Sequence, residues 1–254
     1  MSLLEFKDVN IIYKKKSEET HAVKDVSLNI NPGEIVGLVG ESGCGKTSLG
    51  RAAIGLTPIS SGSIFFEGTS IHEVSYKKRK EILKKMQMIF QDPYGSLNPR
   101  LQIGTALLDV MDVHSIGDNK NDRLARALKL LDSVDLPENS IERYPHEFSG
   151  GQRQRICIAR ALTLEPSIII ADEPVSALDV SIQSEILELL ESLRGERKLA
   201  FLFISHDLSV VRNLCDRVAV MFNGKIVETG IAKEVIDNPK HEYTQKLVNA
   251  VPSI

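Results

Sequence analysis

The sequence predicts an α/β fold with a parallel sheet core, an N-terminal antiparallel β subdomain and an inserted α-helical subdomain. Continuous apolar runs at 35–39, 167–171 and 199–204 are typical of strands that are buried on both faces of a parallel sheet. The first thirty residues alternate polar and apolar side chains, as half-buried strands do. Apolar residues take helical spacing between about 93 and 163, which predicts the insertion.

The N-terminal part is expected to form two strands, at 4–6 and 22–30, on either side of a polar turn over 14–19. Asn31-Pro32-Gly33 is a turn signal before the buried strand at 35–39. A helix from Lys46 through Leu56 should follow that strand.

In the insertion, Pro137 and Pro145 interrupt the helical pattern, and another helix begins near Arg153. The apolar residues that recur on one helix face are Leu124, Leu128, Leu131 and Val134. Beyond the insertion, residues 218–222 and 225–228 predict a hairpin, because Asn223-Gly224 suits a two-residue turn.

Composition indicates one domain over residues 1–254, with a short C-terminal extension at about 232–254. The chain is 42% apolar and 26% charged, which is sufficient for a sizeable core. Its net charge of −3 gives no field that would attract nucleic acid, so no nucleic-acid partner is expected. One basic cluster, 77–80 with Lys84 and Lys85, is interpreted as a solvated helix face.

Membrane attachment is expected only through partner proteins. No stretch reaches the roughly 18 apolar residues of a membrane span, and the acidic start does not resemble a secretory signal. Cys44, Cys157 and Cys215 lack the spacing of a metal site or a disulfide framework, which favours a reducing cytosol.

A phosphate-binding loop is the strongest chemical signal. Gly40-Glu-Ser-Gly-Cys-Gly-Lys46-Thr47 lies between a predicted strand and a predicted helix, a context that a chance glycine-rich turn would lack. Its amides and the helix N-terminus supply positive potential. Lys46 would reach the β- and γ-phosphates, and Thr47 would bind Mg²⁺.

Two carboxylates end the buried strand at 167–171. Asp172 suits the metal, and Glu173 is a candidate base for an attacking water. Alone they could be a solvated loop edge. Phe148-Ser-Gly-Gly-Gln152 precedes a helix, where Ser149 is a plausible N-cap and the glycines leave amides open to an anion.

Together these motifs resemble the nucleotide-binding subunit of ABC transporters, a P-loop NTPase, over essentially the whole chain. The resemblance identifies Ser149–Gln152 as the signature sequence, with Phe148 in place of the usual leucine, and 176–179 as the D-loop. It implies catalytic roles for Gln91, Glu173 and His206. It also implies Mg²⁺ ligands at Thr47, Gln91 and Asp172.

ATP is the implied nucleotide. The residues expected to bind it are Tyr13, Gly40, Glu41, Ser42, Gly43, Cys44, Gly45, Lys46, Thr47, Ser48, Ser149, Gly150, Gly151 and Gln152. Plainer interpretations remain open for Tyr13 as a strand-end aromatic, His206 as a locally bonded histidine and Gln91 as a loop residue. Cys44 is interpreted as a packing residue, because the loop needs small side chains there.

Two further segments resemble the branch that imports di- and oligopeptides, with nickel importers close by. They are Gln91–Arg100 (QDPYGSLNPR) and His241–Leu247 (HEYTQKL). Relatives in that branch often carry a cysteine-rich C-terminal iron–sulfur segment. No cysteine follows Cys215 here, so no cluster is predicted.

The predicted function is ATP hydrolysis that energises import, with peptides as the expected solute and nickel or another solute as the alternative. The implied partners are membrane-spanning permease subunits, a second ATPase subunit and, indirectly, an extracytoplasmic solute-binding protein. A different second ATPase chain is favoured over an identical one. The implied location is the cytoplasmic face of the membrane. A non-transport ABC-type ATPase and a non-enzymatic nucleotide sensor are the other classes considered.

Overall fold

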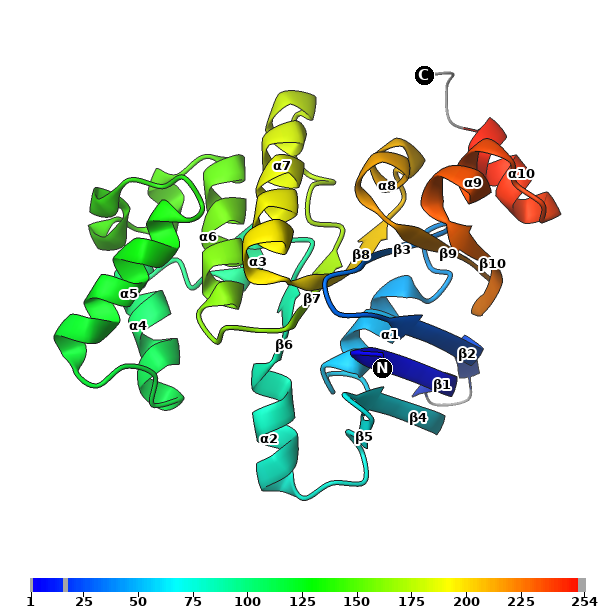
Figure 1. Cartoon of the computed structure of the whole chain (residues 1–254), viewed down its shortest axis with the longest axis horizontal. Coiled ribbons are helices and arrows are strands. Elements are labelled where there is room, and N and C mark those ends of the chain that lie inside the picture. Colours follow the sequence, from blue (N-terminus) through cyan, green and yellow to red (C-terminus); the bar gives the residue numbers. More distant parts are fainter. Residues whose placement is uncertain (1, 16–17, 251–254) are drawn as a thin grey trace.

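A six-stranded sheet forms the centre of the molecule (Figure 1), in a computed structural model that describes residues 2–15 and 18–250. Its strands are parallel except β10, which is antiparallel to β9. The order across the sheet is β10 (Lys225–Ile231), β9 (Arg217–Phe222), β3 (Ile35–Val39), β8 (Ala200–Ser205), β7 (Ile168–Asp172) and β6 (Met86–Ile89). The predicted parallel core is confirmed, with the Asn223-Gly224 hairpin adding an antiparallel edge.

A second, antiparallel sheet packs beside the first and confirms the N-terminal β subdomain (Figure 1). Its order is β2 (Glu18–Ile30), β1 (Leu4–Lys15), β4 (Ser61–Phe66) and β5 (Thr69–Ser70). The polar turn predicted over 14–19 is too long, because Lys14 pairs with Glu19 within the strands. The centre of that turn, residues 16–17, lies outside the described residues.

Alternate side chains of the central strands enter two separate cores. In β8, Phe201 and Phe203 pack with helices on one face, while Leu202 and Ile204 pack with the antiparallel sheet and α1 on the other. All four are essentially buried. Burial on both faces explains why these strands are continuous apolar runs.

Helix α1 (Lys46–Ala53) lies between the two sheets (Figure 1) and begins directly at the end of the phosphate-binding loop. The expected continuation to Leu56 is wrong. Gly55 takes a left-handed conformation, with φ of +73°, and the helix ends before it.

The remaining helices cover the mixed sheet or form the insertion. In chain order they are α2 (Tyr76–Lys84), α3 (Pro93–Ser96), α4 (Ile103–Val113), α5 (Lys120–Asp132), the 3₁₀ turns Glu138–Glu142 and Pro145–Glu147, α6 (Gly150–Leu162), α7 (Val180–Arg197), α8 (Leu208–Leu214), α9 (Ala232–Asp237) and α10 (Glu242–Asn249). The two proline-containing breaks of the insertion thus become 3₁₀ turns rather than α-helix.

Within the insertion, the apolar face predicted for α5 and the turn after it is confirmed at Leu131 and Val134, which are fully buried, but not at Leu124. Ala127, Leu130 and Leu131 are buried, whereas Leu124 is 40% exposed. The spacing indicated the helix, but several apolar faces were compatible with it, and packing against α4 and α6 selects one.

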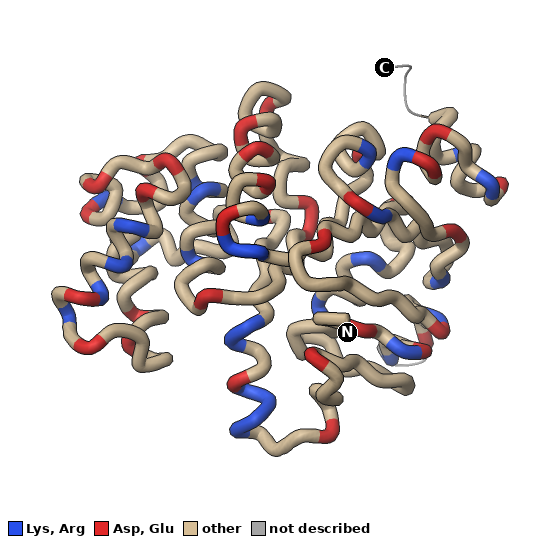
Figure 2. The backbone as a smooth tube through the Cα atoms, viewed as in Figure 1, with Lys and Arg blue, Asp and Glu red and all other residues tan. Residues whose placement is uncertain are grey.

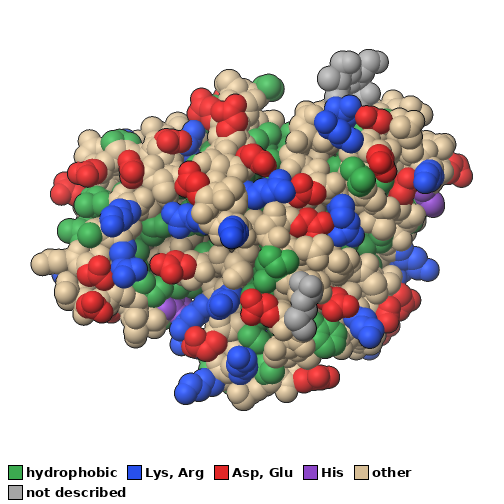
Figure 3. Space-filling model, in the orientation of Figure 1, with side chains coloured by type: hydrophobic (Ala, Val, Ile, Leu, Met, Phe, Trp, Pro, Cys, Tyr) green, Lys and Arg blue, Asp and Glu red, His purple; other side chains and the backbone are tan. Residues whose placement is uncertain are grey.

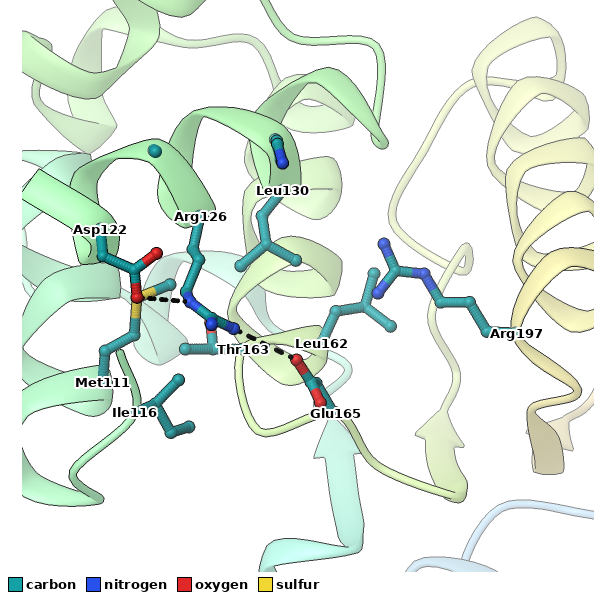
Figure 4. A pocket seen from close by; sticks show the side chains of 11 residues that line it. Met111, Ile116, Asp122, Arg126, Leu130, Leu162, Thr163, Glu165 and Arg197 are labelled. Carbon is teal, nitrogen blue, oxygen red and sulfur yellow. Dashed lines mark hydrogen bonds and ion pairs between the residues drawn. The ribbon is translucent and has the colours of Figure 1, made fainter. Parts of the chain in front are cut away.

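A cavity of about 330 Å³ lies where α5 meets the end of α6 (Figure 4). Leu130 and Leu162 contribute apolar surface to it. Across it, Arg126 pairs with Asp122 at 3.0 Å and reaches Glu165 at 3.7 Å. Arg126 therefore ties the insertion to the segment that leads into β7.

The basic cluster colours α2 blue along its length (Figure 2). Its side chains Lys77, Lys78 and Lys80 are exposed, as expected of a solvated helix face. Over the face seen in Figure 3, acidic and basic side chains are otherwise interspersed. Among the described residues, no helix has the length and apolar character needed to cross a membrane.

We expect Phe201→Ala to lower the free energy of unfolding by about 3–5 kcal/mol, because it leaves a cavity at the centre of the mixed sheet. Val113→Ala, at a position 70% exposed, should change it by less than about 0.5 kcal/mol. Urea unfolding followed by circular dichroism measures both. Equal effects of the two substitutions would contradict this description of the core.

Candidate active site

The candidate chemical residues lie at one edge of the mixed sheet because its parallel strands end there. The Gly40–Ser48 loop follows β3, and Gln91 follows β6. Asp172 ends β7, with Glu173 next to it, and His206 follows β8. In open α/β sheets this carboxyl edge is the usual place for a ligand.

The phosphate-binding loop curls around the amine of Lys46. Lys46 is only 5% exposed, and its Nζ donates to the carbonyl oxygens of Gly40 at 2.7 Å and Glu41 at 2.9 Å. No carboxylate forms a salt bridge with it within 2–15 and 18–250. A buried cation whose hydrogen-bond partners are uncharged fits an anionic ligand such as phosphate.

Gly45 shows why the loop requires glycine. Its φ is +111°, and a Cβ atom there would lie 2.2 Å from the carbonyl oxygen of Ala22. The loop thus packs directly on β2, with no space for a side chain at this point.

Thr47 and Asp172 form an oxygen pair below the loop. The Thr47 hydroxyl donates to Asp172 Oδ1 at 2.9 Å, and Asp172 is 3% exposed. Burial raises the pKa of the Asp172 carboxyl, although the hydrogen bond from Thr47 and the charges of Arg51 and Lys46 oppose this. A hydroxyl and a carboxylate fit Mg²⁺, which takes few protein ligands and completes its shell with phosphates and water.

Glu173 is held from two sides. Gln91 Nε2 donates to Glu173 Oε2 at 2.9 Å, and His206 Nδ1 lies 3.3 Å from the same oxygen. The Glu173 backbone is left-handed, with φ of +47°, which costs a non-glycine residue about 1–3 kcal/mol. Gln91 therefore contacts the candidate base and makes no hydrogen bond to the Thr47–Asp172 pair in this structure.

These residues surround a cavity of about 690 Å³, within the usual size of a small-molecule site. The residues that line it are Tyr13, Thr20, Ala22, Ser42, Gly43, Gly45, Lys46, Thr47, Ser48, Gln91, Glu173 and His206. The Tyr13 hydroxyl donates to Ser48 Oγ at 3.0 Å, and the residue is 42% exposed. An open aromatic ring beside a phosphate-binding loop suits a flat base.

The Ser149–Gln152 segment does not line this cavity. It caps α6 reciprocally, since Ser149 Oγ accepts from Gln152 N at 3.3 Å and Gln152 Oε1 accepts from Ser149 N at 3.0 Å. The predicted N-cap is confirmed. Ser149 and Gly150 are exposed, so this surface is open to another molecule.

Cys44 is 7% exposed, and its Sγ lies 3.9 Å from Lys46 Nζ. Burial raises the pKa of its thiol, despite the opposing charge of Lys46. Both observations support the packing interpretation rather than a reactive thiol.

Thr20 and Ala22 of β2 were missed in the sequence. Thr20 pairs directly with Tyr13 across the β1–β2 hairpin, and Ala22 supports Gly45. The register of the hairpin could have predicted Thr20, because the second strand of a hairpin places a residue directly opposite Tyr13.

Fold and strand-end geometry together define a P-loop ATPase domain. A sequence profile of the ABC transporter family matches residues 23–176, and the chain belongs to this family. It is an ATPase of the transporter type.

Among its relatives, the oligopeptide transport ATP-binding protein OppF of Streptococcus mutans is 51% identical over 98% of this chain and 82% of that protein. The OppF of Bacillus subtilis is 48% identical over the same shares. The glutathione import ATP-binding protein GsiA of Pectobacterium atrosepticum is 48% identical over 95% of this chain and 38% of that protein.

Solved structures of the family share the fold. That of cbiO1 from Clostridium perfringens, part of the transporter complex cbiONQ, has a TM-score of 0.82 and 28% identity, covering 99% of this chain and 96% of cbiO1. A dimeric ATP-binding cassette with bound ADP and phosphate has a TM-score of 0.79 and 29% identity, covering 90% of this chain and 98% of its own.

We expect Asp172→Asn to raise the melting temperature of the nucleotide-free protein at pH 7. The folded-state pKa of Asp172 is raised, so its stabilising contribution is present below the unfolded pKa of about 3.9 and is lost as pH rises through the folded value. The gain should therefore shrink towards pH 4.

Thermal melts between pH 4 and 7.5, with EDTA present, measure this difference. Asp109→Asn, on the exposed part of α4, is the matched control and should show no such pH-dependent gain. A gain that grows on acidification would contradict the assignment.

Proposed function

We propose that this chain is the subunit whose ATP hydrolysis energises import of di- or oligopeptides across a membrane. One observation carries the catalytic part. Lys46, Glu173, Gln91 and His206 surround one cavity at the ends of four parallel strands, with the Thr47–Asp172 pair beside it.

In the proposed mechanism, Lys46 binds the β- and γ-phosphates and Tyr13 stacks on the base. Glu173 accepts a proton from the attacking water, while Gln91 and His206 orient Glu173 and that water. Catalysis is chiefly positional and electrostatic, as in phosphoryl transfer generally. The two contacts to Glu173 Oε2 support this role, since they fix the side chain before a ligand arrives.

The metal in this proposal is Mg²⁺, held by Thr47 and Asp172, with Gln91 as a further ligand. Bound there, the ion supplies neutralisation of phosphate charge. Gln91 contacts Glu173 in this structure, so a role at the metal requires its side chain to change partner.

A complete active site is proposed to need a second ATPase chain. The exposed Ser149–Gln152 segment lies outside its own cavity, although its helix N-terminus suits an anion. A partner chain arranged head to tail can present this segment to the nucleotide, and each chain then completes the other's site. The dimeric cassette structure supports such pairing. A different second chain is favoured over an identical one.

The other proposed partners are permease subunits that hold the chain at the cytoplasmic membrane face, and, through them, an extracytoplasmic solute-binding protein. The insertion after Gln91 is the proposed docking region. Peptides are the proposed solute because relatives at about 50% identity are named for peptide transport. Glutathione, the solute in the name of GsiA, is itself a small peptide.

Uptake in a deletion strain tests this function. Reintroducing the wild-type gene should restore uptake of labelled di- and oligopeptides, and Glu173→Gln should not. Unchanged peptide uptake in the deletion strain, with lost nickel uptake, would assign the chain to a nickel importer instead.

We expect Glu173→Gln to reduce kcat for ATP hydrolysis about 10²- to 10⁴-fold, because the amide keeps the shape of the base but cannot accept the proton. Its affinity for ATP should stay close to wild type. Lys46→Ala, in contrast, should weaken ATP binding about 10- to 100-fold by removing a charge-assisted contact. Calorimetric binding and phosphate-release assays separate the two effects. Wild-type turnover by Glu173→Gln would show that another group is the base.

We expect Ser149→Arg to block nucleotide-dependent pairing while leaving ATP binding to the single chain nearly intact. In the Glu173→Gln variant, dimers should accumulate when ATP is added, as measured by light scattering. They should form with the chain alone if it pairs with itself, and only with the second ATPase subunit if it does not. Adding Ser149→Arg should remove them. The control is Ser133→Arg at the end of α5, away from the cavity. A monomer that hydrolyses ATP at full rate, independent of concentration and of Ser149→Arg, would contradict the shared site.

A further inference from the structure

The C-terminal helix α10 contacts the phosphate-binding loop through one hydrogen bond. The backbone N–H of Glu41 donates to the hydroxyl of Tyr243 at 2.9 Å, joining residues 202 positions apart in the chain. Tyr243 belongs to the His241–Leu247 segment, to which the proposed catalytic mechanism gives no role. Its hydroxyl contacts the loop two residues after β3 ends at Val39.

The Tyr243 ring is fixed before it reaches the loop. It is 7% exposed and stacks on Phe222, with ring centroids 4.1 Å apart. The helix start is fixed too, because His241 Nδ1 accepts from Tyr243 N at 3.1 Å. Glu228 of β10 accepts from the backbone N–H of His241 at 3.0 Å. The Tyr243 side chain therefore loses little conformational entropy when its hydroxyl accepts the hydrogen bond from the loop.

The same part of the chain supports the loop at two further points. Gly224 N, in the β9–β10 turn, donates to the carbonyl oxygen of Cys44 at 3.1 Å. Gly40 lies so close to β9 that a Cβ atom there would be 2.1 Å from the carbonyl oxygen of Met221. The Gly224 and Met221 contacts come from backbone atoms, whereas the Tyr243 contact comes from a side chain. The Tyr243 hydrogen bond can therefore be removed by a substitution that leaves the backbone unchanged.

We propose that Tyr243 is a positioning residue for nucleotide binding, whose hydroxyl holds Glu41 so that the phosphate-binding loop is preorganised for ATP. Lys46 Nζ bonds to the carbonyl of Glu41, so fixing the Glu41 backbone also fixes a partner of that amine. Without the hydroxyl, the backbone at Glu41 is held by fewer contacts, so ATP must order more of the loop when it binds and the affinity falls by that cost. The inference rests on the proposed role of the loop as the phosphate site.

Burial raises the pKa of the Tyr243 hydroxyl, so the group stays protonated through the range of ordinary assays. Its effect on nucleotide binding should therefore be constant between pH 6.5 and 8.5. Tyr243 touches neither the cavity nor the candidate base, so its action is on binding rather than on the chemical step.

The test is Tyr243→Phe, which keeps the ring on Phe222 and removes only the hydroxyl. Loss of one neutral hydrogen bond should raise the Kd and the KM for ATP about three- to tenfold, with kcat changed less than about twofold. Calorimetry with the wild-type and variant chains, alongside steady-state ATPase rates, gives both quantities. Tyr76→Phe, at a position 83% exposed on α2, is the matched control and should bind ATP as the wild type does.

A double-mutant cycle locates the effect at the Glu41 amide. Glu41→Pro removes the N–H donor, so the Tyr243→Phe substitution added to it should weaken binding no further. Unchanged affinity in Tyr243→Phe would overturn the inference, as would full additivity in the cycle. Lys46→Ala keeps these outcomes separate from the proposed function. If Lys46→Ala and Tyr243→Phe both bind ATP normally, the loop is not the phosphate site. If Lys46→Ala loses ATP binding and Tyr243→Phe retains it, only the proposed role of Tyr243 is wrong.

Discussion

Burial of the mixed sheet on both faces is the constraint on which the site depends. The apolar residues of β3, β7 and β8 are covered by helices on one side and by α1 with the second sheet on the other, so their side chains serve only packing. Polar groups reach a ligand only where a strand stops, and the parallel arrangement brings these ends together. Thr47 and Asp172, which are far apart in sequence, thereby come within 2.9 Å. The polar side chains therefore lie at the carboxyl edge of the mixed sheet, because its interior is filled by apolar side chains.

Sequence reasoning succeeded where one physical signal was sufficient. Continuous apolar runs predicted β3, β7 and β8, and the glycine-rich loop predicted how β3 passes into α1. It failed where the local pattern was compatible with more than one structure. Strands β4 and β6 were not predicted. Leu124 is exposed, although its helical spacing also suited the buried face of α5. The contact between Glu41 and Tyr243 carried no local signal at all, because nothing near either residue indicates how α10 returns to the loop.

The arrangement also separates the two surfaces that we propose bind the nucleotide. Lys46 and Thr47 of the loop before α1 line a cavity, while the N-terminus of α6 is capped by its own Ser149 and Gln152, and Ser149 is exposed. Arg155 of α6 forms ion pairs with both Asp135 and Glu185, so the helix that displays this surface is joined to the segment after α5 and to α7.

The amine of Lys46 gives the ligand-free loop a particular electrical character. Its two carbonyl partners supply dipoles but no net negative charge, and the amine is almost fully buried. The loop thus carries a buried positive charge, which a bound anion would neutralise. Because an anion that binds only the folded chain stabilises it, the melting temperature of this protein should rise with the concentration of nucleotide.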